Sequence, residues 1–223
     1  MNELESESID LIVTAPPYNI GTVYGTHPDI QTFDEYREML SNVWSECARV
    51  LKAGEAMIVE CADTVLSDGT YVSLAALMQK ILIEQRLCLV ERHINFNLTE
   101  KGVEQPEHGW SDDFRAKGPA HSNLHQILVF RKAVTPAFDE STGKILYYMY
   151  PSNEDGHPCP FPSKFISFVL DRYFHVGMHV LDPFAGVGRL GCEVLRRGGV
   201  YFGYEIEERH CKTATSNLRN VNT

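Results

Sequence analysis

Apolar positions along the chain alternate between short continuous runs and longer stretches in which they recur every three or four residues. The first run, IDLIVT at 9–14, predicts a buried parallel strand that must stop by Pro16, since proline cannot donate to a central ladder. Thr32 then has the position of an N-cap, and apolar residues at helical spacing continue to Lys52, with Gly54 ending the helix. The same pattern predicts further strands at 56–62, 87–96, 125–130, 179–182 and 200–205, and further helices at 72–85, 162–174, 188–197 and 207–220. Strands that alternate with helices indicate an α/β fold, in which helices cover both faces of a sheet.

Two segments interrupt this alternation. Residues 97–124 contain several glycines and prolines with no hydrophobic period, which predicts a long irregular insertion and a candidate substrate-contact loop. Residues 133–156 form a second irregular connection, with a short strand expected at 145–150. The chain has no internal repeat and no low-complexity tract, and its length suits one substantial core. We therefore expect a single domain over residues 1–223.

Composition narrows the class of protein. No apolar run approaches the roughly 18 residues of a membrane span, and the acidic opening MNELESESID is unlike a secretory signal. Six scattered cysteines without a C-x-x-C pair predict reduced thiols in a cytoplasmic protein and argue against a metal site. The formal charge of −10 counts against tight unaided binding to nucleic acid, because duplex binding rests mainly on Lys and Arg side chains that neutralise phosphates.

A glycine-rich loop follows the strand at 179–182. The string VLDPFAGVGRLG places Gly186 and Gly188 between a strand and a helix, where missing side chains let a ligand approach the backbone and the helix start offers unpaired N–H groups. Glu205 ends the next strand, and an acid at that position can accept hydrogen bonds from ribose hydroxyls. A tight strand–helix turn with an incidental glutamate would show the same G-x-G, and a dinucleotide-dependent oxidoreductase would share both features.

The full loop resembles the S-adenosylmethionine (SAM) loop of amino-group DNA methyltransferases. The resemblance implies SAM as the cofactor, with Asp182 facing its methionine amino group, Glu205 holding its ribose, and the backbone around Phe184, Gly186 and Gly188 lining the site. The segment HPCPFPSKF at 157–165 resembles the family segment that closes over the methionine end, which adds Pro158, Phe161 and Ser163 to the expected cofactor residues. Arg189 departs from the family, which often has Ser or Thr after the second glycine.

LIVTAPPYN, at 11–19, resembles the catalytic loop of the same family, where Asp, Asn or Ser precedes Pro-Pro and an aromatic residue. The polar side chain and the first proline carbonyl draw the hydrogens of an exocyclic amine, and the aromatic ring stacks on a base flipped out of the duplex. Here Pro16, Pro17 and Tyr18 are present, but Ala15 replaces the acid. Losing one hydrogen bond to a charged group, about 1.5–3 kcal/mol, implies a roughly ten- to hundredfold slower reaction.

Ala15 therefore predicts a chain that methylates DNA poorly or not at all. Ala15 fits two origins, an engineered replacement of aspartate or a natural alanine in a degenerate subunit. The residues around Ala15 keep the family pattern, which favours the engineered replacement. Aspartate at this position would indicate adenine N6 and serine cytosine N4, so adenine is the expected target only because it is the commoner one. The insertion residues Trp110, Arg115 and Lys117 are candidate substrate contacts, since basic and aromatic side chains together suit phosphates and bases. Asn19, next to the catalytic loop, is a further candidate contact.

The order of the two loops resembles the β group of these enzymes, a circular permutation of the usual methyltransferase chain. It implies a Rossmann-like class I methyltransferase fold, with a mostly parallel seven-stranded sheet that has one reversed strand, and with both loops at the carboxyl ends of strands. Family members usually begin with another strand, which MNELESES is too short and polar to supply. We therefore expect one edge strand to be missing, so that either cofactor binding is weaker in this protein or the sequence is shortened at its start.

Two hypotheses remain beside the oxidoreductase, which gives no reason for Pro16-Pro17-Tyr18. The first is a SAM-dependent DNA methyltransferase of restriction-modification type that acts on an exocyclic amine, with DNA as its partner. The second is a non-catalytic methyltransferase-like subunit of a homo- or hetero-oligomer, which the acidic charge and the open sheet edge would suit.

Overall fold

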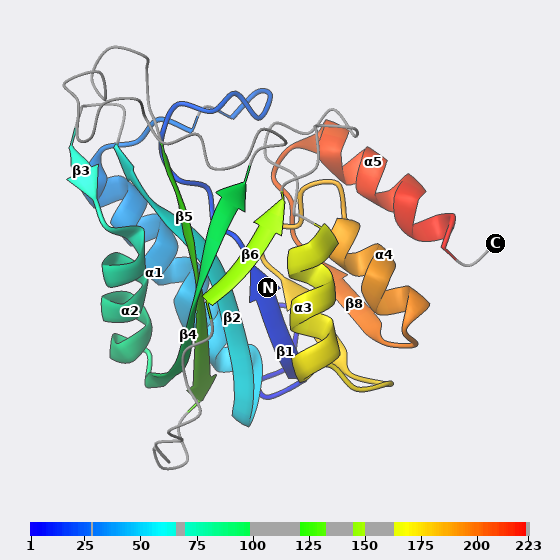
Figure 1. Ribbon diagram of the computed structural model, residues 1–223. Helices are drawn as coiled ribbons and strands as arrows, with labels where there is room; N and C mark the ends of the chain where they lie inside the picture. Colours follow the sequence, from blue (N-terminus) through cyan, green and yellow to red (C-terminus); the bar gives the residue numbers. More distant parts are fainter. Residues whose placement is uncertain (28, 66–69, 99–120, 133–144, 150–162, 222–223) are drawn as a thin grey trace.

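The computed structural model describes residues 1–27, 29–65, 70–98, 121–132, 145–149 and 163–221, which build a twisted sheet between two layers of helices (Figure 1). Its strands are β1 (Ile9–Thr14), β2 (Leu51–Val65), β3 (Tyr71–Val72), β4 (Leu87–Leu98), β5 (His121–Lys132), β6 (Ile145–Met149), β7 (His179–Asp182) and β8 (Val200–Gly203). Its helices are α1 (Phe33–Val50), α2 (Leu74–Glu84), α3 (Ser163–Tyr173), α4 (Arg189–Arg196) and α5 (Glu208–Arg219).

The strands pair in the order β6-β4-β5-β2-β1-β7-β8, and the short β3 pairs with β2 outside this path. Along the path β5 alone is antiparallel to its neighbours β2 and β4, while the pairs β4–β6, β1–β2, β1–β7 and β7–β8 are parallel. This arrangement confirms the predicted mostly parallel, seven-stranded sheet with one reversed strand. It also places β1 and β7, which precede the two candidate loops, side by side within the sheet.

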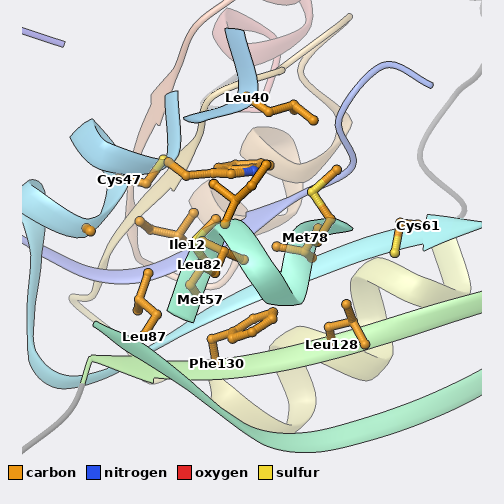
Figure 2. Packing of buried hydrophobic residues seen from close by; sticks show 14 of the residues in the cluster. Ile12, Leu40, Cys47, Met57, Cys61, Met78, Leu82, Leu87, Leu128 and Phe130 are labelled. Carbon is orange, nitrogen blue, oxygen red and sulfur yellow. The ribbon is translucent and has the colours of Figure 1, made fainter. Parts of the chain in front are cut away.

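Each face of the sheet buries its own apolar cluster. Alternate strand residues such as Ile12, Met57 and Phe130 pack against α1 and α2 (Figure 2). The same cluster contains the fully buried Trp44. The residues between them, among them Val13 and Ile58, pack on the other face with α3 and α4. Successive side chains of β1 are buried on opposite faces of the sheet, which explains why Leu11, Ile12 and Val13 are all apolar.

The first helix and the second strand differ from their predicted bounds. α1 begins after Thr32, whose side chain accepts a hydrogen bond from the Glu35 backbone while Glu35 bonds back, so the expected N-cap is confirmed as a capping box. The helix ends at Val50 rather than Lys52, because Leu51 already pairs with Ile9 of β1. Gly54 lies inside β2 with φ 81°, in the irregularity that separates the pairs Ile9–Leu51 and Leu11–Ala56. It therefore marks a bulge and not a helix end.

β8 forms one edge of the sheet within the described residues, since β7 is the neighbour found for it there. The first eight residues adopt turns and not a strand; they are held by Arg49, which donates to the carbonyls of Met1 and Leu4, and by a bond from the Tyr204 hydroxyl to Glu3. The opening segment thus supplies no edge strand, as its polarity predicted. No helix in the described part of the chain is long and apolar enough to cross a membrane.

Candidate active site

The two candidate loops lie side by side. β1 and β7 are parallel neighbours, with Leu11 opposite Val180 and Ile12 opposite Leu181, so their carboxyl ends reach the same edge of the sheet. The Thr14 hydroxyl at the end of β1 donates to Asp182 Oδ1 at the end of β7 over 2.8 Å. This bond, between residues 168 positions apart, places the loop at residues 15–18, here called the proline corner, beside the loop at residues 182–188, here called the glycine corner. The expected position of both loops at one edge of the sheet is confirmed.

Asp182 is completely buried at this junction. Its Oδ1 accepts hydrogen bonds from Thr14 and from the Phe184 backbone N–H, whereas Oδ2 is buried with no hydrogen-bond partner among the described residues. Burial raises the pKa of Asp182 to about 7, although those two hydrogen bonds lower it, and nearby Glu205 raises it further. A buried carboxyl oxygen with a raised pKa is suited to a cationic group of a ligand, because the positive charge would favour the ionised form of Asp182.

The glycine loop is shaped by two residues with left-handed backbones. Gly186 has φ 52° and Gly188 φ 76°, a conformation that other residues adopt at a cost. A Cβ at Gly188 would lie 3.1 Å from the Ala214 Cβ, so close packing against α5 also requires glycine there. Beside this loop, Phe184 packs edge-on against Trp44 with ring centroids 5.9 Å apart.

Glu205 reaches the glycine loop from the end of β8. Its Oε2 accepts a hydrogen bond from Gly186 N–H at 2.8 Å and its Oε1 one from Glu207 N–H at 2.9 Å. The side chain is 14% exposed, and each carboxylate oxygen can accept a second bond. Glu205 therefore braces the loop and keeps acceptor capacity for a pair of neighbouring hydroxyls such as those of ribose.

The proline corner leaves β1 with Ala15 partly exposed, Pro16 buried and Tyr18 partly exposed. The Pro17 carbonyl accepts a 2.7 Å hydrogen bond from the hydroxyl of Tyr36 in α1. Tyr36 is fully buried, and burial raises its pKa well above its ordinary value, which keeps the hydroxyl protonated as a donor. The corner is thus held from below by α1, and the Tyr18 ring keeps surface on which a planar group can stack.

Asn19 closes the loop that follows this corner. It is fully buried with φ 58°, its Nδ2 donates to the Gln31 carbonyl and its Oδ1 accepts from the Gln31 N–H. The Asp29 carboxylate accepts from the backbones of Asn19 and Ile20. These contacts make Asn19 the clasp of a loop over residues 19–31. A buried side chain with both ends engaged argues against the substrate contact expected for it.

The tip of the same loop docks on the start of α5. Glu207, which is 3% exposed, accepts hydrogen bonds from the Thr26 hydroxyl and from both the backbone N–H and Nδ1 of His27. Burial would raise the pKa of Glu207, but the bonds from His27 and Thr26 outweigh it and lower the pKa to about 2. Arg209 adds a bond to the Tyr24 carbonyl. The loop at 19–31 is therefore bound, through Thr26 and His27, to the segment that follows β8 and carries Glu205 and Glu207.

Several expected site residues remain predictions. Ser163 is exposed at the first position of α3, and Pro158, Phe161, Trp110, Arg115 and Lys117 lie outside the described residues. No cluster of three or more His, Cys, Asp or Glu side chains in the described ranges is placed to hold a metal ion. Sequence reasoning missed Thr14, Tyr36 and Glu207, whose roles depend on contacts with distant parts of the chain.

The known proteins whose sequences are similar to this chain are DNA methyltransferases. Residues 9–142 and 101–216 match the family described as DNA methylase. The chain is 27% identical to the type II methyltransferase M.HpaI of Haemophilus parainfluenzae, over 98% of this chain and 70% of that protein. It is 22% identical to the DNA adenine methyltransferase YhdJ of Escherichia coli K12, over 98% and 79%.

Solved structures share the fold at low identity. TTHA0409 of Thermus thermophilus, complexed with S-adenosyl-L-methionine, superposes with a TM-score of 0.70 at 20% identity, covering 99% of this chain and 89% of the other. The cytosine-N4-specific PvuII DNA methyltransferase superposes with a TM-score of 0.71 at 16% identity, covering 99% and 86%. The architecture is therefore that of class I methyltransferases.

Proposed function

Because this chain belongs to the DNA methylase family, in its amino-methylating group, we propose that it binds SAM and DNA and directs methyl transfer to an exocyclic amine, adenine N6 in the first place. The observation that supports this proposal is the hydrogen bond between Thr14 and Asp182, which places the start of the proline corner beside the start of the glycine corner. The full-length similarity to an adenine methyltransferase supports the choice of adenine. The shared fold with a cytosine-N4 enzyme makes cytosine the alternative target.

The residues of the glycine corner fit the parts of SAM. The buried Oδ2 of Asp182, which has no hydrogen-bond partner within the described ranges, would accept hydrogen bonds from the cationic methionine amino group. Glu205 would hold the two ribose hydroxyls, and the left-handed backbone at Gly186 and Gly188 would let the cofactor approach closely. The edge of Phe184 would limit the site on the side of α1. When bound, SAM supplies an electrophilic methyl group on its sulfonium.

The proline corner fits an amine acceptor that has been flipped out of the duplex. Tyr18 would stack on the base, and the Pro16 carbonyl would accept one hydrogen of the amine, while Tyr36 fixes the peptide unit after Pro17. Ala15 offers no second acceptor, so the amine lone pair is poorly localised. We therefore expect slow transfer by the chain as it stands.

Replacing Ala15 tests the proposal. With tritiated SAM and long DNA prepared without methylation, Ala15→Asp should label the DNA roughly ten- to hundredfold faster than the unaltered chain, from the 1.5–3 kcal/mol of a charged hydrogen bond. Both proteins should bind SAM with similar affinity in calorimetry, and neither should bind NAD. A folded Ala15→Asp protein that binds no SAM or labels no DNA would refute the proposed function.

A second candidate is a non-catalytic subunit of a larger complex. Co-purification of a basic partner, with no labelling by Ala15→Asp alone, would support this candidate over the first.

A further inference from the structure

A buried acid and a buried histidine lie next to the proline corner, outside the residues assigned so far. The Tyr18 hydroxyl donates to Glu60 Oε2 at 3.3 Å, and Glu60 Oε1 lies 2.5 Å from His125 Nδ1. Glu60 is 4% and His125 5% exposed. The three side chains form a chain of contacts that runs from the sheet to the ring expected to meet the base.

The sheet places these two residues together at its functional edge. β2 and β5 are antiparallel, with Ala62 opposite His125, so Glu60, two positions before Ala62, projects from the same face as His125. Further along that face the strands carry Ile58, Ile127 and Val129. Along β2 and β5 the polar pair thus follows this apolar row, toward the carboxyl end of β2 and the proline corner.

Burying an acid and a histidine costs desolvation free energy, which points to a role for this pair beyond packing. A buried ionisable pair is often no more stabilising than well-packed apolar residues of similar size, and the neighbouring row shows that apolar residues fit here. What apolar residues cannot do is hold the Tyr18 hydroxyl. The Tyr18 hydroxyl reaches Glu60 Oε2 at 3.3 Å, at the long end for an O–H···O hydrogen bond, as is common for active-site bonds when no substrate is bound.

We propose that Glu60 is a positioning residue, oriented by His125, which fixes the ring plane of Tyr18 before a flipped base arrives. With its proton on Nδ1, His125 donates to one carboxylate oxygen and leaves the other directed at Tyr18. An anchored ring loses less freedom when the base stacks, so the amine is held in line for transfer. This inference rests on the proposed function and names residues through which the same site is organised.

A double-mutant cycle tests it, in the Ala15→Asp background where transfer is measurable. Single-turnover labelling of DNA is compared for the parent, Glu60→Gln, Tyr18→Phe and the double variant, all at saturating SAM. Glu60→Gln and Tyr18→Phe should each slow transfer about tenfold, because each weakens the same charge-assisted hydrogen bond. The double variant should be no more than about twofold slower than Tyr18→Phe, since the second change has nothing left to remove.

Glu91→Gln is the matched control. Glu91 also accepts from a tyrosine hydroxyl, that of Tyr173, and from His93, but it does so beneath α3 and away from the loops. It should leave the transfer rate unchanged, and none of the variants should alter the dissociation constant for SAM. If Glu60→Gln fails to fold, Tyr18→Phe decides alone, because it keeps the ring and removes only the hydroxyl.

The outcomes separate the two proposals. Effects that multiply in the double variant, or a Tyr18→Phe protein as fast as its parent, would overturn the positioning role and leave the proposed function standing. A parent that binds no SAM or labels no DNA would overturn the proposed function and this inference with it.

Discussion

The buried carboxyl of Asp182 should make SAM binding depend on pH. Burial raises the pKa of Asp182 to about 7, and its Oδ2 has no hydrogen-bond partner among the described residues. The cationic amino group of SAM would favour the ionised carboxylate, so the proton on Asp182 must leave before the complex forms. Lowering the pH therefore opposes binding, because the proton and the cofactor compete for the same group.

The size of the effect follows from this pKa. With a pKa of about 7, roughly three-quarters of Asp182 is ionised at about pH 7.5 and only a few per cent at about pH 5.5. The apparent association constant for SAM should then fall about twentyfold between these two pH values, where an α-amino group with a pKa of about 8 stays mostly protonated. Asp182→Asn should bind SAM about ten- to hundredfold more weakly at the higher pH, the cost of about 1.5–3 kcal/mol for a charged hydrogen bond.

Calorimetric titration across this pH range provides the assay. The unaltered chain should show the steep dependence, and Asp182→Asn a flat one, because an amide does not titrate. 5′-Methylthioadenosine, which lacks the amino acid part of SAM, should bind both proteins with little dependence on pH. A SAM affinity that stays constant from about pH 5.5 to 7.5, or a dependence that survives in Asp182→Asn, would refute the role assigned to Asp182.

Two further predictions concern the loops around the site. Gly188→Ala should lower the free energy of unfolding in urea by about 1–2 kcal/mol from its left-handed backbone, and by more where the new Cβ meets Ala214. At Gly177, where φ is 86° and an added Cβ would have no atom within 4 Å, substitution by alanine should show the backbone cost alone. Equal losses of unfolding free energy in Gly188→Ala and Gly177→Ala would contradict the close packing of Gly188 against α5. Glu207→Gln should speed hydrogen exchange at Thr26 and His27, because the docked loop tip loses a charged acceptor. Glu208→Gln, an exposed change beside it, should not, and unchanged exchange in Glu207→Gln would show that docking of the loop tip does not depend on this acid.

Features written in neighbouring residues were predicted well from the sequence. The N-cap Thr32 with Glu35 three positions later is a local signal, and the capping box forms as expected. The predicted end of α1 was wrong, because pairing of Leu51 with Ile9 of β1 overrides the helical spacing that continues to Lys52. Gly54 resembles a helix stop in the sequence, yet its left-handed backbone serves a bulge in β2.

The site was predictable as far as strand ends decide it. Asp182 and the proline corner follow parallel strands, so their meeting at one sheet edge follows from topology. Glu207 and His27 are 180 positions apart and carry no pattern that links them, and Glu60 is a single polar residue inside a predicted apolar strand. Asn19 was expected at the substrate, but its side chain is buried in bonds to Gln31 that depend on the closed shape of the loop.

Identifying the methylated atom decides whether the proline corner and the glycine corner form one methyl-transfer site. Ala15→Asp is incubated with SAM that carries a trideuterated methyl group and with unmethylated DNA, which is then digested to nucleosides and weighed by mass spectrometry. Our account predicts deoxyadenosine carrying the heavy methyl group on N6, in amounts well above those from the unaltered chain. Heavy methyl on cytosine N4 would correct the target base alone, whereas no heavy methyl on any exocyclic amine, from a folded protein, would contradict the claim that the two corners form one methyl-transfer site.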